Sequence, residues 1–353
     1  MLKNAKIRNL RAIKELDIED FGQVNLIVGK NGSAKTTFLE ALLYACGAQN
    51  PSLTVNTNAM RGLKYFSDES WPTFFRNMDF SNKIEIKVST TDDVNHRLNI
   101  LPYFQAGQSN RQSEIDKIVS TSGHSVLHSS FPFSQNVNGL EFLYACSDNP
   151  DALHSSKIYR EGEKLKTPDE KKEPVINAIF IGSSAEMDWK QQFGPVQRKK
   201  QVQEVVNLLK EIDQRIEDIA LNEIGLLEVD LGLPNFIPAN LLGGGISRFL
   251  SIALAMLNFR VVLIDEIENG LHHSSQRKIW NAVFSWAQKV DVQVFATTHS
   301  WEAIQAFHAA SQENLFTDNS RLFRIERENG KCKCVKFTQQ ELDTSINNKW
   351  EIR

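Results

Sequence analysis

The sequence predicts an α/β fold with a mostly parallel central sheet, and three observations carry this prediction. Residues 24–47 run from an apolar strand through a glycine-rich loop into a helical pattern. Residues 261–264 are four apolar residues that precede two carboxylates, and residues 292–300, VQVFATTHS, form another apolar run with a polar end. Buried parallel strands deliver polar residues at their carboxyl ends in this way.

The composition is that of an ordinary globular protein. The 353 residues are 41% hydrophobic and 24% charged, and the net charge of −3 predicts no general attraction to nucleic acid, although a local basic face is compatible with it. The four cysteines have no metal-binding spacing and build no disulfide framework, which favours a reducing cytoplasm. No stretch reads as a signal peptide or as a membrane span.

The first elements surround a phosphate-binding loop. We expect strands within residues 7–18 and 24–28, and a helix that stops at Gly47. Between them, GKNGSAKTT matches G-x-x-x-x-G-K-[ST] except at its second glycine. In such a loop the backbone N–H groups surround phosphates, Lys35 reaches the β and γ oxygens, and the Thr36 hydroxyl ligates Mg²⁺. The residues expected to bind ATP here are Gly29, Lys30, Asn31, Gly32, Ser33, Ala34, Lys35, Thr36 and Thr37.

Ala34 replaces the second glycine of that motif. If the position requires a left-handed backbone, the added Cβ costs roughly 1–2 kcal/mol, and if the residue is already helical the cost is close to nil. Neither alternative abolishes phosphate binding. A chance glycine-rich turn is the competing explanation of the loop.

The carboxylates that follow the expected strand at residues 261–264 supply the chemistry that hydrolysis needs. Asp265 would hold the shell of a Mg²⁺ ion, and Glu266 would polarise the attacking water as a general base. His299, at the end of the third strand, could touch the γ-phosphate and report its loss. A simple acidic pair at a strand end and an ordinary strand-end histidine are the competing explanations.

Three glycines precede a helical pattern that extends to Met256. The loop at residues 29–37 already binds the phosphates of this chain's own nucleotide. A second anion-binding helix start would therefore complete the site of another copy, which predicts a head-to-tail dimer that binds two ATP molecules. A glycine-rich helix entry without a ligand is the alternative.

The segments GKNGSAKTT, LLGGGISRFL, LIDEIENGLHHS and ATTHS, in this order, resemble the ABC-type ATPases of the SMC and OLD (overcoming lysogenisation defect) group, and especially the OLD-like branch. The resemblance implies an ABC-type P-loop NTPase fold with an antiparallel N-terminal lobe and a helical lobe, and it implies ATP and Mg²⁺ as cofactors. Leu242 stands where SMC and transporter relatives carry a serine. By the resemblance, the signature that acts in trans comprises Gly243, Gly244, Gly245, Ser247 and Arg248, the D-loop contains Glu268, Asn269 and His272, and Arg11 faces the nucleotide.

We expect a single domain over residues 1–353, with the loop half in 1–100, an insertion and helical lobe at about 101–240, and the signature half in 241–353. The insertion is too short for the coiled-coil arm of SMC relatives. Within it, residues 109–134 read as a serine-rich surface loop or mobile insertion, and 157–173 as a solvated hairpin or loop. Residues 197–221 read as one amphipathic helix whose apolar stripe is core, with a partner site as the alternative. A closing hairpin is expected about Asn329 and Gly330.

Residues 300–353 are too few for the TOPRIM nuclease domain of full-length OLD proteins. The chain therefore resembles the ATPase subunit of two-gene anti-phage modules, such as PARIS-type and retron-associated systems. Its expected partners are further copies of itself, as a dimer or higher oligomer, and a separate effector such as a TOPRIM-type or other nuclease, with DNA a further candidate and no membrane. A DNA repair or recombination ATPase, a nucleotide-binding protein without turnover, and, more weakly, a transporter ATPase stay as alternatives.

Overall fold

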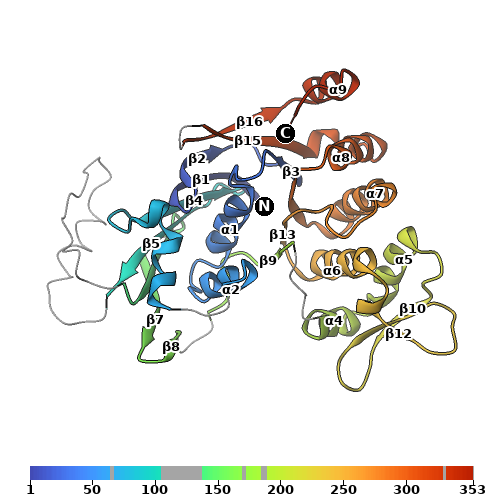
Figure 1. The fold of residues 1–353 in the computed structure, drawn as a ribbon, viewed down its shortest axis with the longest axis horizontal. Helices are drawn as coiled ribbons and strands as arrows, with labels where there is room; N and C mark the ends of the chain where they lie inside the picture. The colour runs from blue at the N-terminus through green and yellow to red at the C-terminus, as the bar shows by residue number, and fades with distance from the viewer. Residues whose placement is uncertain (64–66, 105–136, 169–171, 184–188, 329–330, 353) are drawn as a thin grey trace.

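A computed structural model of the chain describes residues 1–63, 67–104, 137–168, 172–183, 189–328 and 331–352 (Figure 1). The serine-rich segment at residues 109–134 and the expected turn at Asn329 and Gly330 lie outside the described residues.

A six-stranded sheet forms the centre of the molecule. Five strands are parallel, and β16 pairs antiparallel at one edge, in the order β16-β15-β3-β14-β13-β9. Every residue of β3, β13 and β14 is buried, because helices or the second sheet cover both faces. The strands are β3 (Val24–Val28), β9 (Ala178–Ile181), β13 (Val261–Ile264), β14 (Gln293–Thr298), β15 (Ser320–Glu328) and β16 (Lys331–Phe337). The predicted α/β fold and the predicted pairing of the last two strands are confirmed.

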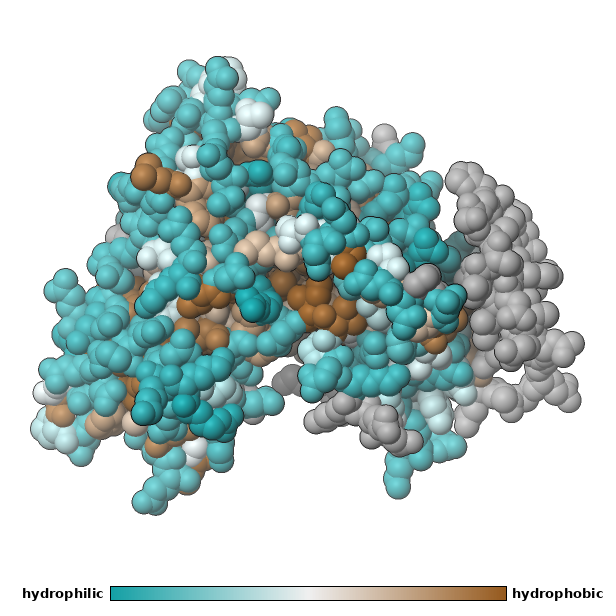
Figure 2. Space-filling model, turned by 180° about the vertical axis from the view of Figure 1, so that it is seen from behind, coloured by the Kyte–Doolittle hydropathy of each residue, from teal (hydrophilic) through white to brown (hydrophobic). Residues whose placement is uncertain are grey.

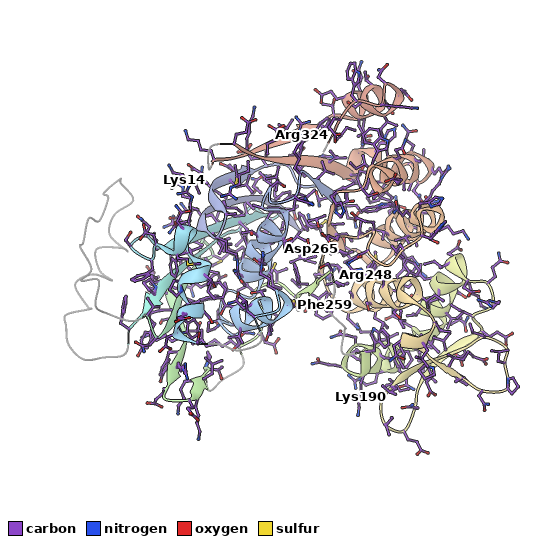
Figure 3. The ribbon with its side chains drawn as sticks, viewed as in Figure 1. Lys14, Lys190, Arg248, Phe259, Asp265 and Arg324 are labelled. Carbon is purple, nitrogen blue, oxygen red and sulfur yellow. The ribbon has the colours of Figure 1, made fainter. Side chains whose placement is uncertain are left out.

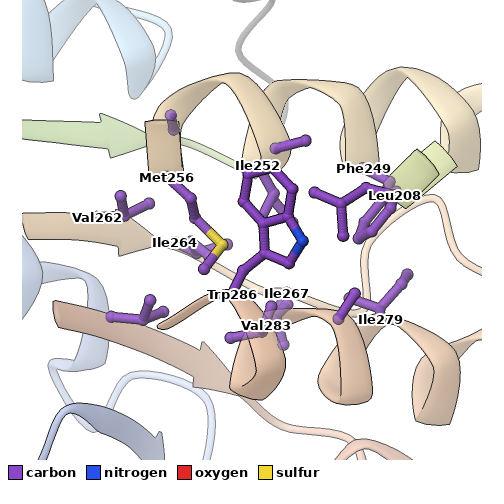
Figure 4. Packing of buried hydrophobic residues seen from close by; sticks show 14 of the residues in the cluster. Leu208, Phe249, Ile252, Met256, Val262, Ile264, Ile267, Ile279, Val283 and Trp286 are labelled. Atoms are coloured by element: carbon purple, nitrogen blue, oxygen red, sulfur yellow. The ribbon is translucent and has the colours of Figure 1, made fainter. Parts of the chain in front are cut away.

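Alternation along the strands sends successive side chains to two different cores. Leu26 belongs to the core under helices α6, α7 and α8, whereas Ile27 belongs to the core that contains α1. In Figure 1 these three helices lie together on one side of the sheet, and α1 lies on the other. Figure 4 shows Trp286 of α7 packed among apolar side chains of α6 and β13. The helices are α1 (Lys35–Cys46), α6 (Gly244–Asn258), α7 (His273–Val290) and α8 (Trp301–Glu313).

An antiparallel lobe packs against α1, as expected. Its seven strands have the order β2-β1-β4-β5-β6-β7-β8. Ile7, Ile86 and Phe142 point to the core beneath α1, whereas Lys6 on the other face pairs with Asp17 at 2.8 Å. The strands are β1 (Leu2–Leu10), β2 (Ile13–Ile18), β4 (Ile84–Thr90), β5 (Asn95–Tyr103), β6 (Gly139–Cys146), β7 (Asn149–Glu161) and β8 (Lys164–Lys166). Between α1 and β4 the chain forms helix α2 (Leu53–Met60) and the 3-10 turns η1 (Asp68–Ser70), η2 (Pro72–Phe74) and η3 (Arg76–Met78). The β7–β8 pair is the hairpin predicted within residues 157–173.

A lobe of helices and a small sheet leads into α6. The prediction of one amphipathic helix over residues 197–221 is wrong at both ends. Helix α4 ends at Arg198 and Lys200 has a positive φ of 58°, whereas α5 ends at Ile212 and Asp213 is extended. Ile216 and Ile219 are buried as predicted, but they reach the core from a turn and from strand β10. The elements are α4 (Trp189–Arg198), α5 (Val202–Ile212), β10 (Asp218–Leu221), β11 (Leu227–Asp230), β12 (Ile237–Pro238) and η4 (Ala239–Leu241).

The chain closes with η5 (Thr317–Asn319) before β15 and with α9 (Gln339–Asn347) after β16. Seen from behind, the surface is largely hydrophilic, with apolar side chains gathered near the middle of the face (Figure 2). Among the described residues, no helix is both long enough and apolar enough to cross a membrane.

Candidate nucleotide site

The polar ends of β3, β13 and β14 meet at one edge of the parallel sheet. The chain leaves β3 through the loop of residues 29–34 and enters α1 at Lys35. His299 follows β14, which pairs with β3, and Asp265 follows β13, the next strand of the sheet. The carboxyl edge of a parallel sheet is where this class of fold places its ligands.

Ala34 has a left-handed backbone, with φ 79° and ψ 20°, at the N-cap of α1. Of the two alternatives for this residue, a strained left-handed backbone and an unstrained helical one, the structure has the left-handed backbone. The cost of a left-handed alanine is roughly 1–2 kcal/mol, because its Cβ approaches the following carbonyl group. Gly29 cannot be replaced in the same way, since a Cβ there would lie 2.4 Å from the carbonyl oxygen of Ile325.

The Lys35 ammonium is buried inside the loop. Its Nζ donates to the carbonyl oxygens of Gly29 at 2.6 Å and of Lys30 at 3.2 Å. Burial lowers the pKa of Lys35, and the carboxylates of Asp265, Glu266 and Glu268 act in the opposite direction. A cation that is desolvated in this way and lies near a loop of backbone N–H groups gains from an anionic ligand.

Thr36 and Asp265 lie in direct contact. The Thr36 hydroxyl donates to both carboxylate oxygens of Asp265, at 3.0 and 2.9 Å. Thr297 donates to the same carboxylate at 2.7 Å, and its hydroxyl accepts from the backbone N–H of Glu266 at 2.8 Å. The ends of β13 and β14 are thus tied together at the head of α1.

Glu266 and His299 lie beside this group. The His299 ring nitrogen Nδ1 is 3.9 Å from the Glu266 carboxylate and 3.2 Å from the Glu268 carboxylate. Glu266 has a positive φ of 50°, which is uncommon for a side chain of this size. Its side chain is 39% exposed, so water can reach it.

The signature glycines begin helix α6. Gly243 has φ 89° and its position is open, since an added Cβ would meet nothing within 4 Å. Gly244 and Gly245 pack against Gly270 in the D-loop, where a Cβ on Gly245 would lie 3.3 Å from the Gly270 carbonyl oxygen. Only small residues allow these two segments to approach so closely.

Two residues of the expected signature face their own chain. Arg248 is buried, and its guanidinium donates to the carbonyl oxygens of Gly182 and Asp265, each at 2.5 Å (Figure 3). The Ser247 hydroxyl donates to the Ala239 carbonyl at 2.9 Å. Within this chain Arg248 joins the start of α6 to the residues that follow β9 and β13, and Ser247 joins it to η4; their expected contact with a partner's nucleotide stays a prediction.

The expectation that Arg11 faces the nucleotide is corrected. Its Nε lies 3.0 Å from the Glu40 carboxylate, its Nη2 donates to Asn58 at 2.7 Å, and its guanidinium covers the Phe74 ring. Since the Arg11 side chain is only 11% exposed, it is a buried structural cation rather than one that faces a nucleotide.

Sequence reasoning missed a second cation beside α1. Arg61 pairs with Glu40 at 2.6 Å, and its Nη2 lies 3.4 Å from the Thr37 hydroxyl at the helix start. Its position directly after α2 was the only signal, and it became meaningful only once α2 was packed on α1.

The remaining D-loop residues are placed as follows. Asn269 donates to the Ser183 carbonyl at 2.9 Å, and the His272 ring lies 4.0 Å from the His273 ring.

The loop fits a phosphate chain on its own geometry. The Ser33 hydroxyl is buried and has no hydrogen-bond partner within the described part of the chain. Because buried polar groups are normally hydrogen-bonded, this hydroxyl is free to donate to a bound phosphate. Thr36 and Asp265 offer the hard oxygen ligands that Mg²⁺ prefers, together with substrate phosphates. Over the described ranges, no three side chains of the His, Cys, Asp and Glu types converge on a metal site, so a magnesium ion here would rely on those phosphates.

A cleft of about 800 Å³ opens on the outer side of the loop. It lies between residues 30–33 and the part of β15 that extends past β3, and Glu351 also lines it. The cleft is on the opposite side of β3 from β14 and β13, and so from Asp265 and His299.

Comparison with known proteins adds the family context. Residues 24–304 match a protein family described as AAA domain, putative AbiEii toxin, Type IV TA system. An ATP/GTP phosphatase from Helicobacter pylori is 25% identical over 93% of each chain. A stretch of 49 residues is 48% identical to an uncharacterized protein of Methanocaldococcus jannaschii, which is 14% of this chain and 22% of that protein.

Among solved structures, an SMC head bound to the C-winged helix domain of ScpA resembles the chain with a TM-score of 0.50. The identity is 10%, and the likeness covers 97% of this chain and 99% of the other. It shows the fold alone, and it confirms the expected SMC-like architecture.

Proposed function

Because the chain belongs to the family described as AAA domain, putative AbiEii toxin, Type IV TA system, we propose that it is an ATP-driven switch that controls a separate effector protein. Family membership makes the chain a P-loop ATPase, and the matched residues 24–304 include every predicted nucleotide-site residue except Arg11. The observation that carries the proposal is the contact of Thr36, Asp265 and Thr297 at the head of the buried Lys35 loop.

In the proposed mechanism the loop N–H groups and Lys35 bind the phosphates, and the Ser33 hydroxyl gains a partner. Glu266 takes a proton from the attacking water, which is worth about 100-fold or more for a well-placed general base. His299 contacts the γ-phosphate. When bound by Thr36 and Asp265, Mg²⁺ would neutralise charge on the phosphate oxygens.

A second copy completes the site in this proposal. The open, left-handed Gly243 and the neighbouring Gly244 are exposed at the start of α6, and Leu241 just before them is 73% exposed. Helix-start N–H groups on such a surface suit the γ-phosphate held by a partner. With Arg248 and Ser247 directed inward, contact in trans depends on this backbone.

The proposed role is that of sensor, scaffold or switch in a bacterial anti-phage system, with a nuclease as the effector. The family description names a putative AbiEii toxin and a Type IV TA system, and this wording supports the proposal of a role beside a second protein. ATP binding and hydrolysis at a dimer interface provide the two states that a switch requires.

The proposal is tested by phage plating. The native operon is expressed in a sensitive bacterium, as wild type, with Glu266→Gln, and without the neighbouring gene. We expect protection only when the neighbouring gene and an intact Glu266 are both present. Unchanged plating in all three strains would contradict the defence role. ATP turnover that DNA ends stimulate, together with DNA binding that weakens steeply with salt, would favour a repair ATPase instead.

A further inference from the structure

The geometry points to Glu268 as the positioning residue of His299. This inference rests on the proposed function, in which His299 contacts the γ-phosphate. The Glu268 side chain is 10% exposed and makes two contacts with the same histidine. Its Oε1 accepts from the backbone N–H of His299 at 3.1 Å and lies 3.2 Å from the ring nitrogen Nδ1.

The two contacts fix both the backbone and the ring. The first contact holds the residue where the chain leaves β14, and the second places a carboxylate oxygen against one ring nitrogen. A carboxylate oxygen requires a proton on the nitrogen that it contacts, so Glu268 selects the tautomer with hydrogen on Nδ1. A histidine whose second nitrogen is held in this way keeps one ring orientation.

Backbone hydrogen bonds hold the loop that carries Glu268. The Asn269 N–H donates to the Glu266 carbonyl at 2.9 Å, and the Leu271 N–H donates to the Glu268 carbonyl at 3.0 Å. Ile267, just before Glu268, donates its N–H to the Thr297 carbonyl at 3.0 Å. This backbone bond and the Glu268 side chain add to the Thr297 hydroxyl bonds that also join the ends of β13 and β14.

The same loop also reaches the signature. Gly270, two residues beyond Glu268, packs against Gly244 so closely that a Cβ on Gly270 would lie 3.3 Å from the Gly244 carbonyl carbon. Residues 268–270 therefore connect His299, at the γ-phosphate end of the proposed site, with the start of α6, which faces the partner in the proposed dimer. Movement of the signature on binding a second copy would shift the carboxylate that orients His299.

Turnover of four variants tests the assignment: Glu268→Ala, Glu268→Gln, His299→Ala, and the double variant Glu268→Ala with His299→Ala. We expect Glu268→Ala to lower kcat about tenfold or more, the range for an orienting partner of a functional histidine, and to leave KM for ATP nearly unchanged. Glu268→Gln should recover part of the loss, because its amide oxygen accepts the same hydrogen bonds. In the His299→Ala background, Glu268→Ala should cost nothing further.

Glu341→Ala is the matched control. Glu341 also accepts a backbone N–H, from Thr338 at 2.8 Å, but it caps α9 outside the site. Its loss should lower stability without changing kcat. A loss for Glu268→Ala that adds in full to that of His299→Ala would overturn the inference.

A second readout needs no turnover. Nitrogen-15 NMR of histidine-labelled, nucleotide-free protein, with His299→Ala used for assignment, should show the Nδ1–H tautomer at His299 in the wild type and lose it in Glu268→Ala. The same tautomer in both proteins would overturn the inference, and Glu268→Met, which offers no oxygen acceptor, serves if the alanine variant fails to fold. If wild type binds no ATP, the proposed function fails, and this spectrum still decides the role of Glu268.

Discussion

The hydroxyl of Thr36 and the carboxylate of Asp265, 229 residues apart in the chain, lie 2.9 Å apart. Thr36 lies in the first turn of α1 and Asp265 directly follows β13, so the contact forms only when the two halves of the parallel sheet have assembled. The contact joins the phosphate loop to the carboxylate pair that hydrolysis requires. The predictions below follow from this arrangement.

Ala34→Gly should stabilise the protein by about 1 kcal/mol, because glycine adopts the left-handed conformation at φ 79° without strain. ATP turnover should be retained. Urea unfolding measures the change, and Ala309→Gly in the interior of α8 is the control, with an expected loss of about 0.5–1 kcal/mol. Equal losses in the two variants would show that the Ala34 backbone is not left-handed in solution.

Lys35→Met should abolish ATP binding and leave the fold intact. The substitution removes a buried charge whose burial already disfavours the ionised form, so the free energy of unfolding should not fall. Fluorescent-nucleotide titration measures binding, and thermal unfolding measures stability. Lys30→Met, at an exposed position of the same loop, is the comparison and should keep most of the affinity. Normal affinity in Lys35→Met would place the phosphates elsewhere.

Arg248→Met should destabilise the monomer. It leaves the carbonyl groups of Gly182 and Asp265 without their charged donor, and hydrogen bonds to charged groups are worth about 1.5–3 kcal/mol each. Arg215→Ala, which removes an exposed ion pair with Asp213, should cost much less, because solvent screens the pair. Urea unfolding compares the two. A variant of Arg248 with normal monomer stability that fails only to dimerise would restore its role in trans.

Two of the four cysteines should resist alkylation in the native protein. Burial raises the pKa of the Cys46 and Cys334 thiols to about 12, so little thiolate is present near neutral pH. Iodoacetamide labelling followed by mass spectrometry should place adducts on both residues only after denaturation. Because the folded state binds these protons more tightly, their contribution to stability is complete below pH 9.0 and is lost as pH rises toward 12. Rapid native labelling at either residue would contradict this.

The sequence could predict the parts of the site that depend on local pattern. Strand, loop and helix follow one another in the chain around Lys35, and four apolar residues before Asp265 indicate a buried strand. Arg11 and Arg248 could not be placed in this way, because an arginine near a motif has the same appearance in sequence whether it faces a ligand or a buried carbonyl. Their roles are set by tertiary partners: Glu40 for Arg11, and the carbonyl groups of Gly182 and Asp265 for Arg248.

The end of α5 shows the same limit for the fold. Ile216 and Ile219 continue a spacing of three and four, but the pairing of β10 with β11 is stronger than that local preference. Ala34 lies between these cases: the sequence identified the position, and only the backbone angle showed that the alanine is strained.

The most direct test is ATP turnover together with solution mass for the wild type and Glu266→Gln, with Lys35→Met as the control that cannot bind. We predict that the wild type hydrolyses ATP, that Glu266→Gln is about 100-fold slower or more, and that with ATP it accumulates as a dimer or larger oligomer. Undiminished turnover in Glu266→Gln, or a mass that ATP does not change, would contradict the account of a hydrolytic site completed by a second copy.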